Sequence, residues 1–189
     1  MKSLGRREAS LGMGAMLAGC TPEQKAITES NVAAGSQQKL RRVLIAISVR
    51  RVKMTEGQSM SLLQVEELKR SFEAKWPPIG IAIEIVDVDG AADNGGQLIT
   101  AANARFRAGQ FLYLQTSRVK FRNDFVNEYE IEATLYDAAA RKRIWRASTQ
   151  LPDFWKSATK YPFMEDQRPA AADRYVDSLT AKLREDGLL

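Results

Sequence analysis

The chain has 189 residues, of which 28 are Lys or Arg and 23 are Asp or Glu, so its formal net charge is +5. Apolar residues make up 44% of it, a composition typical of a globular protein and not of a collagenous, disordered or multispanning one. It contains no His and one Cys, which excludes a Ser-His-Asp or Cys-His couple, a His-ligated zinc site and an internal disulfide.

The first twenty residues have the pattern of a cleaved export signal. A basic start, MKSLGRRE, is followed by the apolar stretch ASLGMGAMLAG and then by Cys20. As a helix that stretch spans only about 16 Å, too short for the hydrocarbon core of about 30 Å. The alternative is a cytoplasmic N-terminal helix in which Cys20 packs. The glycines of the apolar stretch disfavour a stable helix there, because each interior Gly lowers helix stability by about 1 kcal/mol relative to Ala.

The residues Leu17-Ala18-Gly19-Cys20 resemble the bacterial lipobox. The resemblance implies that residues 1–19 are a signal peptide and that the Cys20 sulfur receives a diacylglyceryl group. The new amino terminus then takes an acyl chain such as palmitate. The mature protein is expected to be a lipoprotein with a membrane anchor, facing the periplasm. Thr21, in place of Asp, favours the outer membrane by the same resemblance.

The export route is left open by the sequence. Arg6 and Arg7 resemble a twin-arginine signal, but Ala9 and Ser10 stand where that signal has a bulky apolar pair. The general secretory route and the twin-arginine route therefore both remain.

Two regions are predicted after the signal. Residues 20–40 are rich in Gln, Ser, Thr and Ala without an apolar period, which predicts a lipidated, flexible tether reaching roughly 25 Å. Residues 41–189 suit a single globular envelope domain. After Cys20 no segment approaches 18 uninterrupted apolar residues, so we expect anchoring and not spanning.

The first half of the domain alternates strands with helices. Residues 42–52 are apolar on both faces, as in an interior strand. Ser59 or Ser61 can cap a helix with an apolar stripe that Pro77 ends. A strand over 79–88, an acidic Gly-rich loop, a helix over 97–106 and a strand starting at 111–114 follow. This alternation predicts right-handed crossovers and parallel pairing.

The second half is predicted to be antiparallel. With a loop at 123–127, a hairpin would place Arg118 opposite Glu132, Lys120 opposite Glu130 and Arg122 opposite Glu128. Each such pair contributes roughly 0.2–1 kcal/mol. A second hairpin turns through 137–143 into a strand over 144–151, with Trp145 and Ala147 facing the core. A final helix over 170–185 carries an apolar stripe of Ala172, Val176, Leu179 and Leu183.

The predicted fold class is therefore α+β, a mixed sheet of about five strands (βαβαβββα) with helices packed on its apolar side. This order, with Leu135-Tyr136-Asp137 followed by Ile144-Trp145-Arg146, resembles the TolB N-terminal domain and small proteobacterial envelope lipoproteins of unknown function. Those proteins often have Gly in the turn between the two motifs, where this chain has Ala138, Ala139 and Ala140.

Motifs that could carry chemistry are weak. Ser36 with Lys39, and Ser157 with Lys160, match SxxK spacing, but no SDN or KTG partner accompanies them, so chance explains both. Asp87, Asp89 and Asp93 offer oxygen ligands for calcium, but lack EF-hand spacing and suit a turn entering a helix equally well. We predict no catalytic residue, no metal site and no cofactor.

One loop is a candidate docking surface. Between residues 153 and 168 the chain holds five large side chains, namely Phe154, Trp155, Tyr161, Phe163 and Met164. Aromatic and Met side chains are enriched at contact hot spots, which favours binding of another envelope protein. The alternative is that these side chains cover the edge of the sheet or the core of the monomer.

Basic residues gather in two places. They are Arg41, Arg42, Arg50, Arg51 and Lys53, and then Arg141, Lys142, Arg143 and Arg146. Export argues against nucleic acid as a partner. The clusters are either a solvated surface or a site for anionic glycan or lipid headgroups.

Three functions remain, in this order. The first is a lipid-anchored accessory or scaffold protein of the bacterial cell envelope that acts by protein contact and is not an enzyme. The alternative is a binder of an anionic small molecule, lipid or glycan, and the third is a carboxylate-based envelope enzyme. A shallow aromatic patch would favour the first, a concave basic pocket the second, and a deep cleft with two close carboxylates the third. The partner and the oligomeric state stay open.

Overall fold

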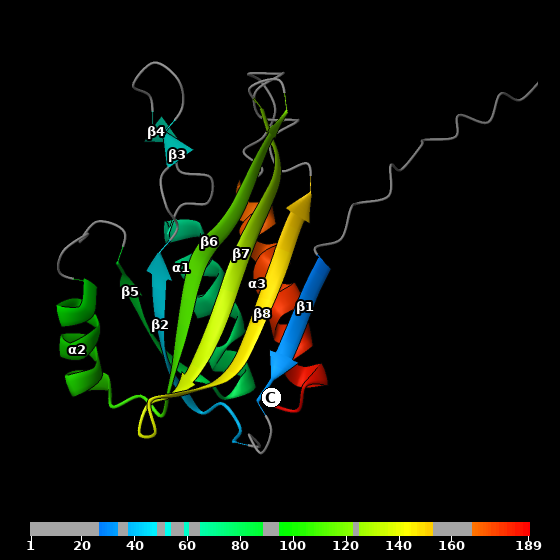
Figure 1. Cartoon of the computed structure of the whole chain (residues 1–189). Coiled ribbons are helices and arrows are strands. Elements are labelled where there is room, and N and C mark those ends of the chain that lie inside the picture. The colour runs from blue at the N-terminus through cyan, green and yellow to red at the C-terminus, as the bar shows by residue number, and fades with distance from the viewer. Residues whose placement is uncertain are drawn as a thin grey trace, which may run out of the picture.

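A six-stranded mixed sheet forms the centre of the computed structural model, in the order β1-β8-β7-β6-β2-β5 (Figure 1). The structure describes residues 27–33, 38–48, 52–53, 59–60, 65–88, 95–122, 125–152 and 168–189. Its strands are β1 (Ile27–Val32), β2 (Arg42–Ser48), β5 (Ala82–Asp87), β6 (Gln110–Arg122), β7 (Phe125–Asp137) and β8 (Lys142–Pro152). A separate small ribbon pairs β3 (Val52–Lys53) with β4 (Ser59–Met60). The helices are α1 (Val65–Lys75), α2 (Gly95–Phe106) and α3 (Arg168–Glu185), with a short 3₁₀ helix, η1 (Pro77–Ile79).

The predicted fold class is confirmed: the molecule is α+β with helices packed on a mixed open sheet. In the main sheet and its three α-helices, the order from β2 to α3 is βαβαβββα, as expected. The sixth strand is β1, which pairs antiparallel with β8 at the edge of the sheet.

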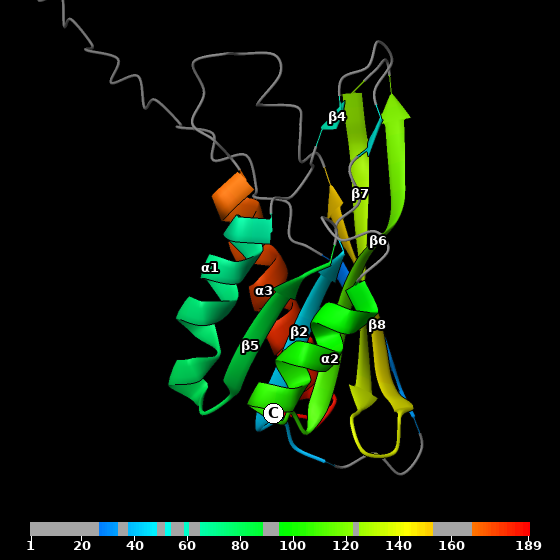
Figure 2. The same cartoon turned by 90° about the vertical axis from the view of Figure 1, so that its left-hand side faces the viewer.

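The crossovers place helices on both faces of the sheet. Strand β2 pairs in parallel with β5 on one side and with β6 on the other, so the connections β2 to β5 and β5 to β6 run in opposite directions across it. Because such crossovers are right-handed almost without exception, their helices lie on opposite faces. Figure 2 shows α1 and α3 together on one side of the sheet. Helix α2 packs over β5 and β2 on the other side.

The main core lies between the sheet and the pair α1–α3. All five residues from Val43 to Ile47 in β2 are buried, as expected of an interior strand. Trp145 and Ala147, predicted to face the core, are 1% and 2% exposed. The predicted stripe on α3 is confirmed as well, since Ala172, Val176, Leu179 and Leu183 are fully buried in this core.

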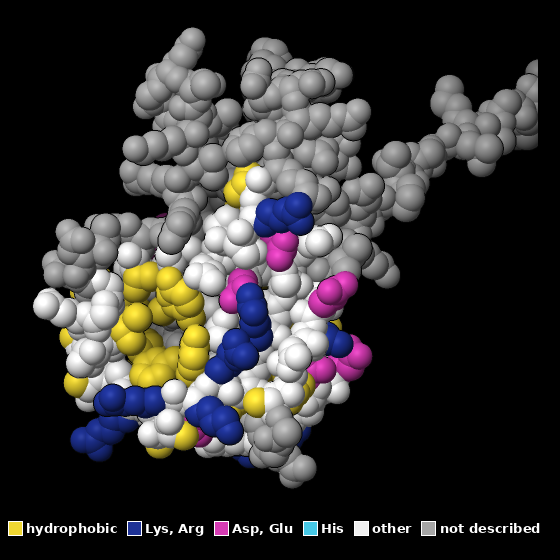
Figure 3. Space-filling model, viewed as in Figure 1, with side chains coloured by type: hydrophobic (Ala, Val, Ile, Leu, Met, Phe, Trp, Pro, Cys, Tyr) yellow, Lys and Arg dark blue, Asp and Glu magenta, His cyan; other side chains and the backbone are white. Residues whose placement is uncertain are grey.

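On the α2 side, the sheet is only partly covered. Helix α2 lies at one margin, and in the described part of the chain no helix covers β6, β7 and β8 on that side (Figures 1 and 3). These three strands are also the longest in the sheet, at 13, 13 and 11 residues. A long, solvent-facing strip of sheet is the result.

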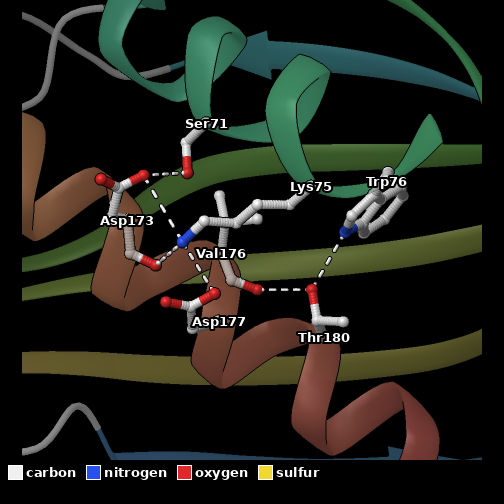
Figure 4. A network of polar contacts seen from close by, with 7 residues as sticks. All are labelled: Ser71, Lys75, Trp76, Asp173, Val176, Asp177 and Thr180. Carbon is white, nitrogen blue, oxygen red and sulfur yellow. Dashed lines mark hydrogen bonds and ion pairs between the residues drawn. The ribbon is translucent and has the colours of Figure 1, made fainter. Parts of the chain in front are cut away.

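Polar contacts fix the angle between α1 and α3 (Figure 4). Lys75 Nζ forms ion pairs with Asp177 Oδ1 at 2.7 Å and Asp173 Oδ1 at 3.4 Å, and Ser71 Oγ donates to Asp173 Oδ1 at 2.7 Å. The fully buried Trp76 donates its indole N–H to Thr180 Oγ1 at 3.0 Å. A buried indole N–H left without an acceptor is costly, so this bond selects one packing of the two helices.

The predicted hairpin register is wrong by two residues at Arg118 and Lys120 and by three at Arg122. Strand β6 pairs with β7 so that Arg118 lies opposite Glu130 and Lys120 opposite Glu128, while Arg122 lies opposite Phe125. The loop is shorter than predicted, because β7 already starts at Phe125. A shift of two leaves a pair on the same face of the sheet, so the alternation of charged and apolar residues, which set the prediction, could not detect it at Arg118 and Lys120. A register irregularity between Lys120 and Phe121 adds the third residue at Arg122.

The tether prediction for residues 20–40 also differs from the structure, over Ile27–Val32. This segment is strand β1, and two of its polar side chains, those of Thr28 and Ser30, bond to the protein. Thr28 Oγ1 lies 2.9 Å from Thr149 Oγ1 and 2.6 Å from Ser178 Oγ, and Ser30 Oγ donates to Asp186 Oδ2. An edge strand held by hydroxyl groups has no apolar period, so the sequence pattern resembled a coil.

Three predicted boundaries are corrected too. The strand predicted over 42–52 ends at Ser48, and Val52 belongs to β3. Ser59 lies in β4 and caps no helix, and Ser61 lies outside the described residues. Ile79 belongs to η1 and not to the following strand, because the two prolines before it hold the backbone in a 3₁₀ turn.

Asp186 is expected to be the residue that holds β1, β8 and α3 together. Its Oδ2 accepts from Ser30 and, at 2.7 Å, from the indole of Trp145, and its side chain is only 13% exposed. We predict that Asp186→Ala lowers the free energy of unfolding by about 1–3 kcal/mol, because the buried Trp145 N–H loses its acceptor. Urea unfolding followed by tryptophan fluorescence measures this.

The matched control, Asp177→Ala on α3, removes a carboxylate that is 65% exposed and should cost about 1 kcal/mol or less. Equal losses in the two variants would contradict the assignment.

Candidate functional site

The uncovered strip of β6, β7 and β8 has two chemically different parts. Side chains alternate along each strand, so residues that do not face α1 and α3 face this strip. Towards the middle of the strands the strip is polar, with Glu132 and Thr134 from β7 and Arg146 and Ser148 from β8. Near the β7–β8 turn and α2, it becomes apolar and hollowed (Figure 3).

The polar part is an ordered network around one carboxylate. Glu132 Oε2 accepts from the guanidinium of Arg146, its neighbour across the strand pair. Glu132 Oε1 accepts from Gln115 Nε2 at 3.3 Å and from Thr134 Oγ1 at 3.2 Å. Beside it, Ser148 Oγ donates to Glu130. Both carboxylates therefore have donors from neighbouring side chains of the same sheet.

These contacts alter the acidity of Glu132. Partial burial is the largest single influence and by itself raises the pKa of Glu132. The hydrogen bond and charge of Arg146, with the hydrogen bonds from Thr134 and Gln115, together outweigh burial, so the pKa of Glu132 lies below its ordinary value of 4.5. The hydrogen bond and charge of Glu132 in turn raise the pKa of Arg146. The pair stays ionised at neutral pH and adds no net charge to the strip.

The apolar part is an open hollow of about 310 Å³ between α2 and the lower ends of β6 and β7. It is lined by Ala46, Ile99, Phe111, Leu112, Tyr113, Tyr136, Asp137, Ala138 and Arg141. Phe111 and Tyr136 lie directly opposite each other in the β6–β7 pair, and Tyr113 lies two residues further along β6 on the same face. Cross-strand aromatic pairs of this kind stabilise a sheet and form a rigid wall.

A small second core explains why the hollow forms beside α2. Leu44 of β2, Ala102 of α2 and Ala108 are buried together, and Ile99, Phe106 and Phe111 pack partly against them. The small side chains of Ala102 and Ala108 let α2 approach the sheet over β2. Farther towards β7 the helix no longer reaches the sheet, so the aromatic wall is left facing open space.

Cationic side chains border the hollow at the end where the β7–β8 turn lies. Figure 3 shows dark-blue Lys and Arg side chains along the lower border of the yellow hydrophobic patch. Arg42 places its guanidinium 4.5 Å from the ring centre of Phe106, and Arg105 pairs with Glu84 at 2.8 Å. Arg107 and Arg141 both have φ of +53°, and among the described residues they are the non-Gly positions with positive φ.

Main-chain bonds bring one residue of each basic cluster, Arg42 and Arg141, to this one end, while Arg50 and Arg51 lie outside the described residues. Gly109 N donates to Arg42 O at 3.0 Å, and Ala138 N donates to Gly109 O at 3.0 Å. The turn after β7 therefore lies beside the start of β2, although about a hundred residues separate them in the chain. Arg146 belongs to the Glu132 pair instead, while Lys142 and Arg143 line a separate polar hollow of about 460 Å³ together with Asn31 and Trp145.

Several predicted site residues lie outside the described residues. These are Cys20, the docking candidates Phe154, Trp155, Tyr161, Phe163 and Met164, and the possible calcium ligands Asp89 and Asp93. In the described ranges, no group of three or more Cys, Asp or Glu side chains is arranged to hold a metal ion. Within the same ranges, no helix combines the length and apolarity needed to cross a membrane.

Of the residues of the hollow, the sequence analysis singled out Arg141, as part of a basic cluster, and did not predict the aromatic wall. The signal was present in the run Phe111-Leu112-Tyr113-Leu114, which is apolar on both faces of β6. Such a run indicates that both faces are covered. In the fold, Leu112 and Leu114 are buried in the main core, while Phe111 and Tyr113 are only partly covered. The amount of cover depends on where α2 ends, which the run itself does not encode.

Comparisons with known proteins show fold-level similarities only. A scan of protein-family models finds none that matches the chain, and a search of curated proteins finds no match. A point variant of the PelC dodecamer from Paraburkholderia phytofirmans superposes with a TM-score of 0.49 at 10% identity, covering 82% of this chain and 96% of that one. A DUF4136 family protein from Bacteroides thetaiotaomicron has a TM-score of 0.46 at 8% identity, with coverage of 88% and 98%. A lipoprotein from Neisseria meningitidis has a TM-score of 0.37 at 10% identity, with coverage of 76% and 99%. At these values the similarities carry no argument about function.

The lowered pKa of Glu132 predicts a pH-dependent contribution of its pair to stability. A carboxylate whose pKa is depressed on folding stabilises the native state above its ordinary pKa of 4.5, and this is lost as pH falls through the lowered value. We expect Arg146→Ala to lower the free energy of unfolding slightly at pH 7 and to raise the pKa of Glu132, because burial then acts without the guanidinium. Urea unfolding at pH 7 and pH 3 should show the difference between variant and parent shrinking at the lower pH. The control, Arg143→Ala, should show the same small difference at both. A difference for Arg146→Ala that does not change with pH would contradict the pairing.

Proposed function

We propose that this chain is a lipid-anchored accessory or scaffold protein of the bacterial cell envelope that acts by contact with another protein and not by turnover. The observation that carries the proposal is the uncovered strip of β6, β7 and β8, in which the carboxylates are bonded to neighbours and an aromatic hollow opens at one end. A shallow aromatic patch of this kind favours protein contact over catalysis.

The size of the strip supports a specific interface. Three strands spaced about 4.8 Å apart and about 36–43 Å long, with the short edge strand β1 beside them, offer roughly 600 Å². Counting both partners gives roughly 1,200 Å², which exceeds the roughly 1,000 Å² expected of a specific interface. Because Glu132 and Arg146 are already paired, a partner that covers them would not leave either charge buried alone.

Anchoring through Cys20 limits where this surface can be. The lipobox resemblance places the acyl groups at Cys20, and β1 starts at Ile27. An extended chain spans at most about 3.3–3.6 Å per residue, so the start of β1 would lie within about 25 Å of the lipid surface. The tether thus has fewer residues than predicted, its greatest reach equals the roughly 25 Å expected from the sequence, and the domain works close to its membrane. A periplasm-facing position, with the outer membrane favoured by Thr21, is part of the proposal.

Lipidation is tested by replacing Cys20. We expect Cys20→Ser to lose metabolic labelling by an alkyne analogue of palmitate and to keep its leader, so that the intact mass rises relative to the processed protein. Thr21→Asp is the matched control, because it should keep both labelling and processing while moving the protein to the inner-membrane fraction. A Cys20→Ser chain that is processed and fractionates like its parent would overturn the anchor.

Contact through the strip is tested by site-specific photo-crosslinking in cells. Gln150 is exposed on β8, on the same face as Arg146 and Ser148, and Ala181 is exposed on α3 on the other side of the domain. We expect a photoreactive residue at Gln150 to give a discrete protein adduct and the same residue at Ala181 to give none. Adducts of equal yield at both positions, or no protein adduct at either, would contradict the proposed surface.

A further inference from the structure

The aromatic hollow has the chemistry of a site for an amphiphile. Its walls are the rings of Phe111, Tyr113 and Tyr136 with the aliphatic side chains of Ile99 and Ala46, and they enclose about 310 Å³. Sites for small organic ligands range from roughly 300 to 1,000 Å³, so this volume suits one hydrocarbon chain and not two. Water in such a hollow has few hydrogen-bonding partners, which favours its replacement by an apolar group.

One cation stands at the border of this apolar space. Arg141 lines the hollow, is exposed, and has no ion pair with any residue that the structure describes. The carboxylate in the same lining, Asp137, accepts the main-chain N–H of Ala140 at 2.6 Å and so helps to form the turn. Lys142 and Arg143 line the separate polar hollow, so Arg141 is the cation in the lining of the aromatic one.

The backbone of Arg141 is held in an unusual conformation. Its φ is +53°, in the left-handed region that favours Gly and is strained for other residues. Gly would form this turn with less strain, so the presence of Arg is not explained by the turn itself. Strained residues of this kind gather at functional sites.

We infer that the hollow binds a single-chain anionic amphiphile, with the hydrocarbon chain against Phe111, Tyr113 and Tyr136 and the anionic head paired with Arg141. A fatty acid and a lysophospholipid share this chemistry. The guanidinium donates two parallel N–H bonds to a carboxylate or a phosphate, which Lys cannot do. This ligand site occupies the hollow at one end of the strip, whereas the protein contact is tested at Gln150 in the polar part, so each can be tested without the other.

The test uses all 189 residues with Cys20→Ser, so that the protein carries no acyl group of its own. Isothermal titration calorimetry with dodecanoate should give saturable binding with one site. Dodecanol, which has the same chain without the charge, should bind about tenfold more weakly. A parallel titration with lauroyl lysophosphatidylglycerol identifies the class of ligand. If it binds more tightly than dodecanoate, the ligand is a lysophospholipid, and if it binds more weakly, the ligand is a fatty acid. Either result supports the site.

Substitutions at two adjacent cations distinguish binding at a specific site from non-specific attraction to positive charge. Arg141→Gln should weaken dodecanoate binding about tenfold and leave dodecanol binding unchanged, whereas Lys142→Gln should alter neither by more than about twofold. Arg141→Gly tests whether a loss of binding comes from misfolding. Because Gly relieves the left-handed strain, this variant should be at least as stable as the parent and should bind dodecanoate as weakly as Arg141→Gln.

Three results would overturn the inference. They are the absence of saturable binding of both anionic probes up to about 1 mM, equal affinity for dodecanoate and dodecanol, and an equal loss of binding from Arg141→Gln and Lys142→Gln. None of these outcomes changes the crosslinking result at Gln150, so failure of the ligand site and failure of the protein contact are distinguishable.

Discussion

In the described part of the chain, three α-helices lie on the two faces of a six-stranded sheet. The crossovers around β2 place two of them on one face and one on the other. Two right-handed connections in opposite directions put α1 on one face and α2 on the other, and the C-terminal helix α3 joins α1. One face is thereby closed by two helices over a core that includes Trp76, Trp145 and Tyr175. The other face has α2 at its margin only. The open strip of β6, β7 and β8, on which both proposals rest, is a direct consequence of this unequal division.

An open sheet face must be compatible with water. In this protein, Glu132 and Arg146 form an ion pair across two strands of that face. The hydrogen bond and charge of Arg146 contribute to the lowered pKa of Glu132. Matched charges keep the strip hydrated without giving it a net charge. They also reduce the cost of covering it with another surface, because each charge brings its own partner into the interface.

The apolar hollow and its cationic border follow from where α2 ends. The helix packs closely over β2 through Ala102 and Ala108 and leaves the wall of Phe111, Tyr113 and Tyr136 uncovered. The turn after β7 then places Arg141 at the rim, in a backbone conformation that Gly would adopt more readily. Protein contact and ligand binding use neighbouring parts of the same face, which gives the envelope protein proposed here two distinct binding properties without any catalytic group.

The sequence by itself determined the βαβαβββα order, the buried strand β2 and the stripe on α3, because each depends on local periodicity. The resemblance of residues 17–20 to a lipobox is likewise a local motif. Only the tertiary structure decided the register of β6 with β7, the pairing of Ile27–Val32 with β8, and the meeting of Arg42 and Arg141 at one end. A two-residue slip preserves the alternation of faces, an edge strand held by hydroxyls has no apolar period, and parallel crossovers join segments about a hundred residues apart. These features arise from contacts between distant segments, and local residue patterns carry no record of such contacts.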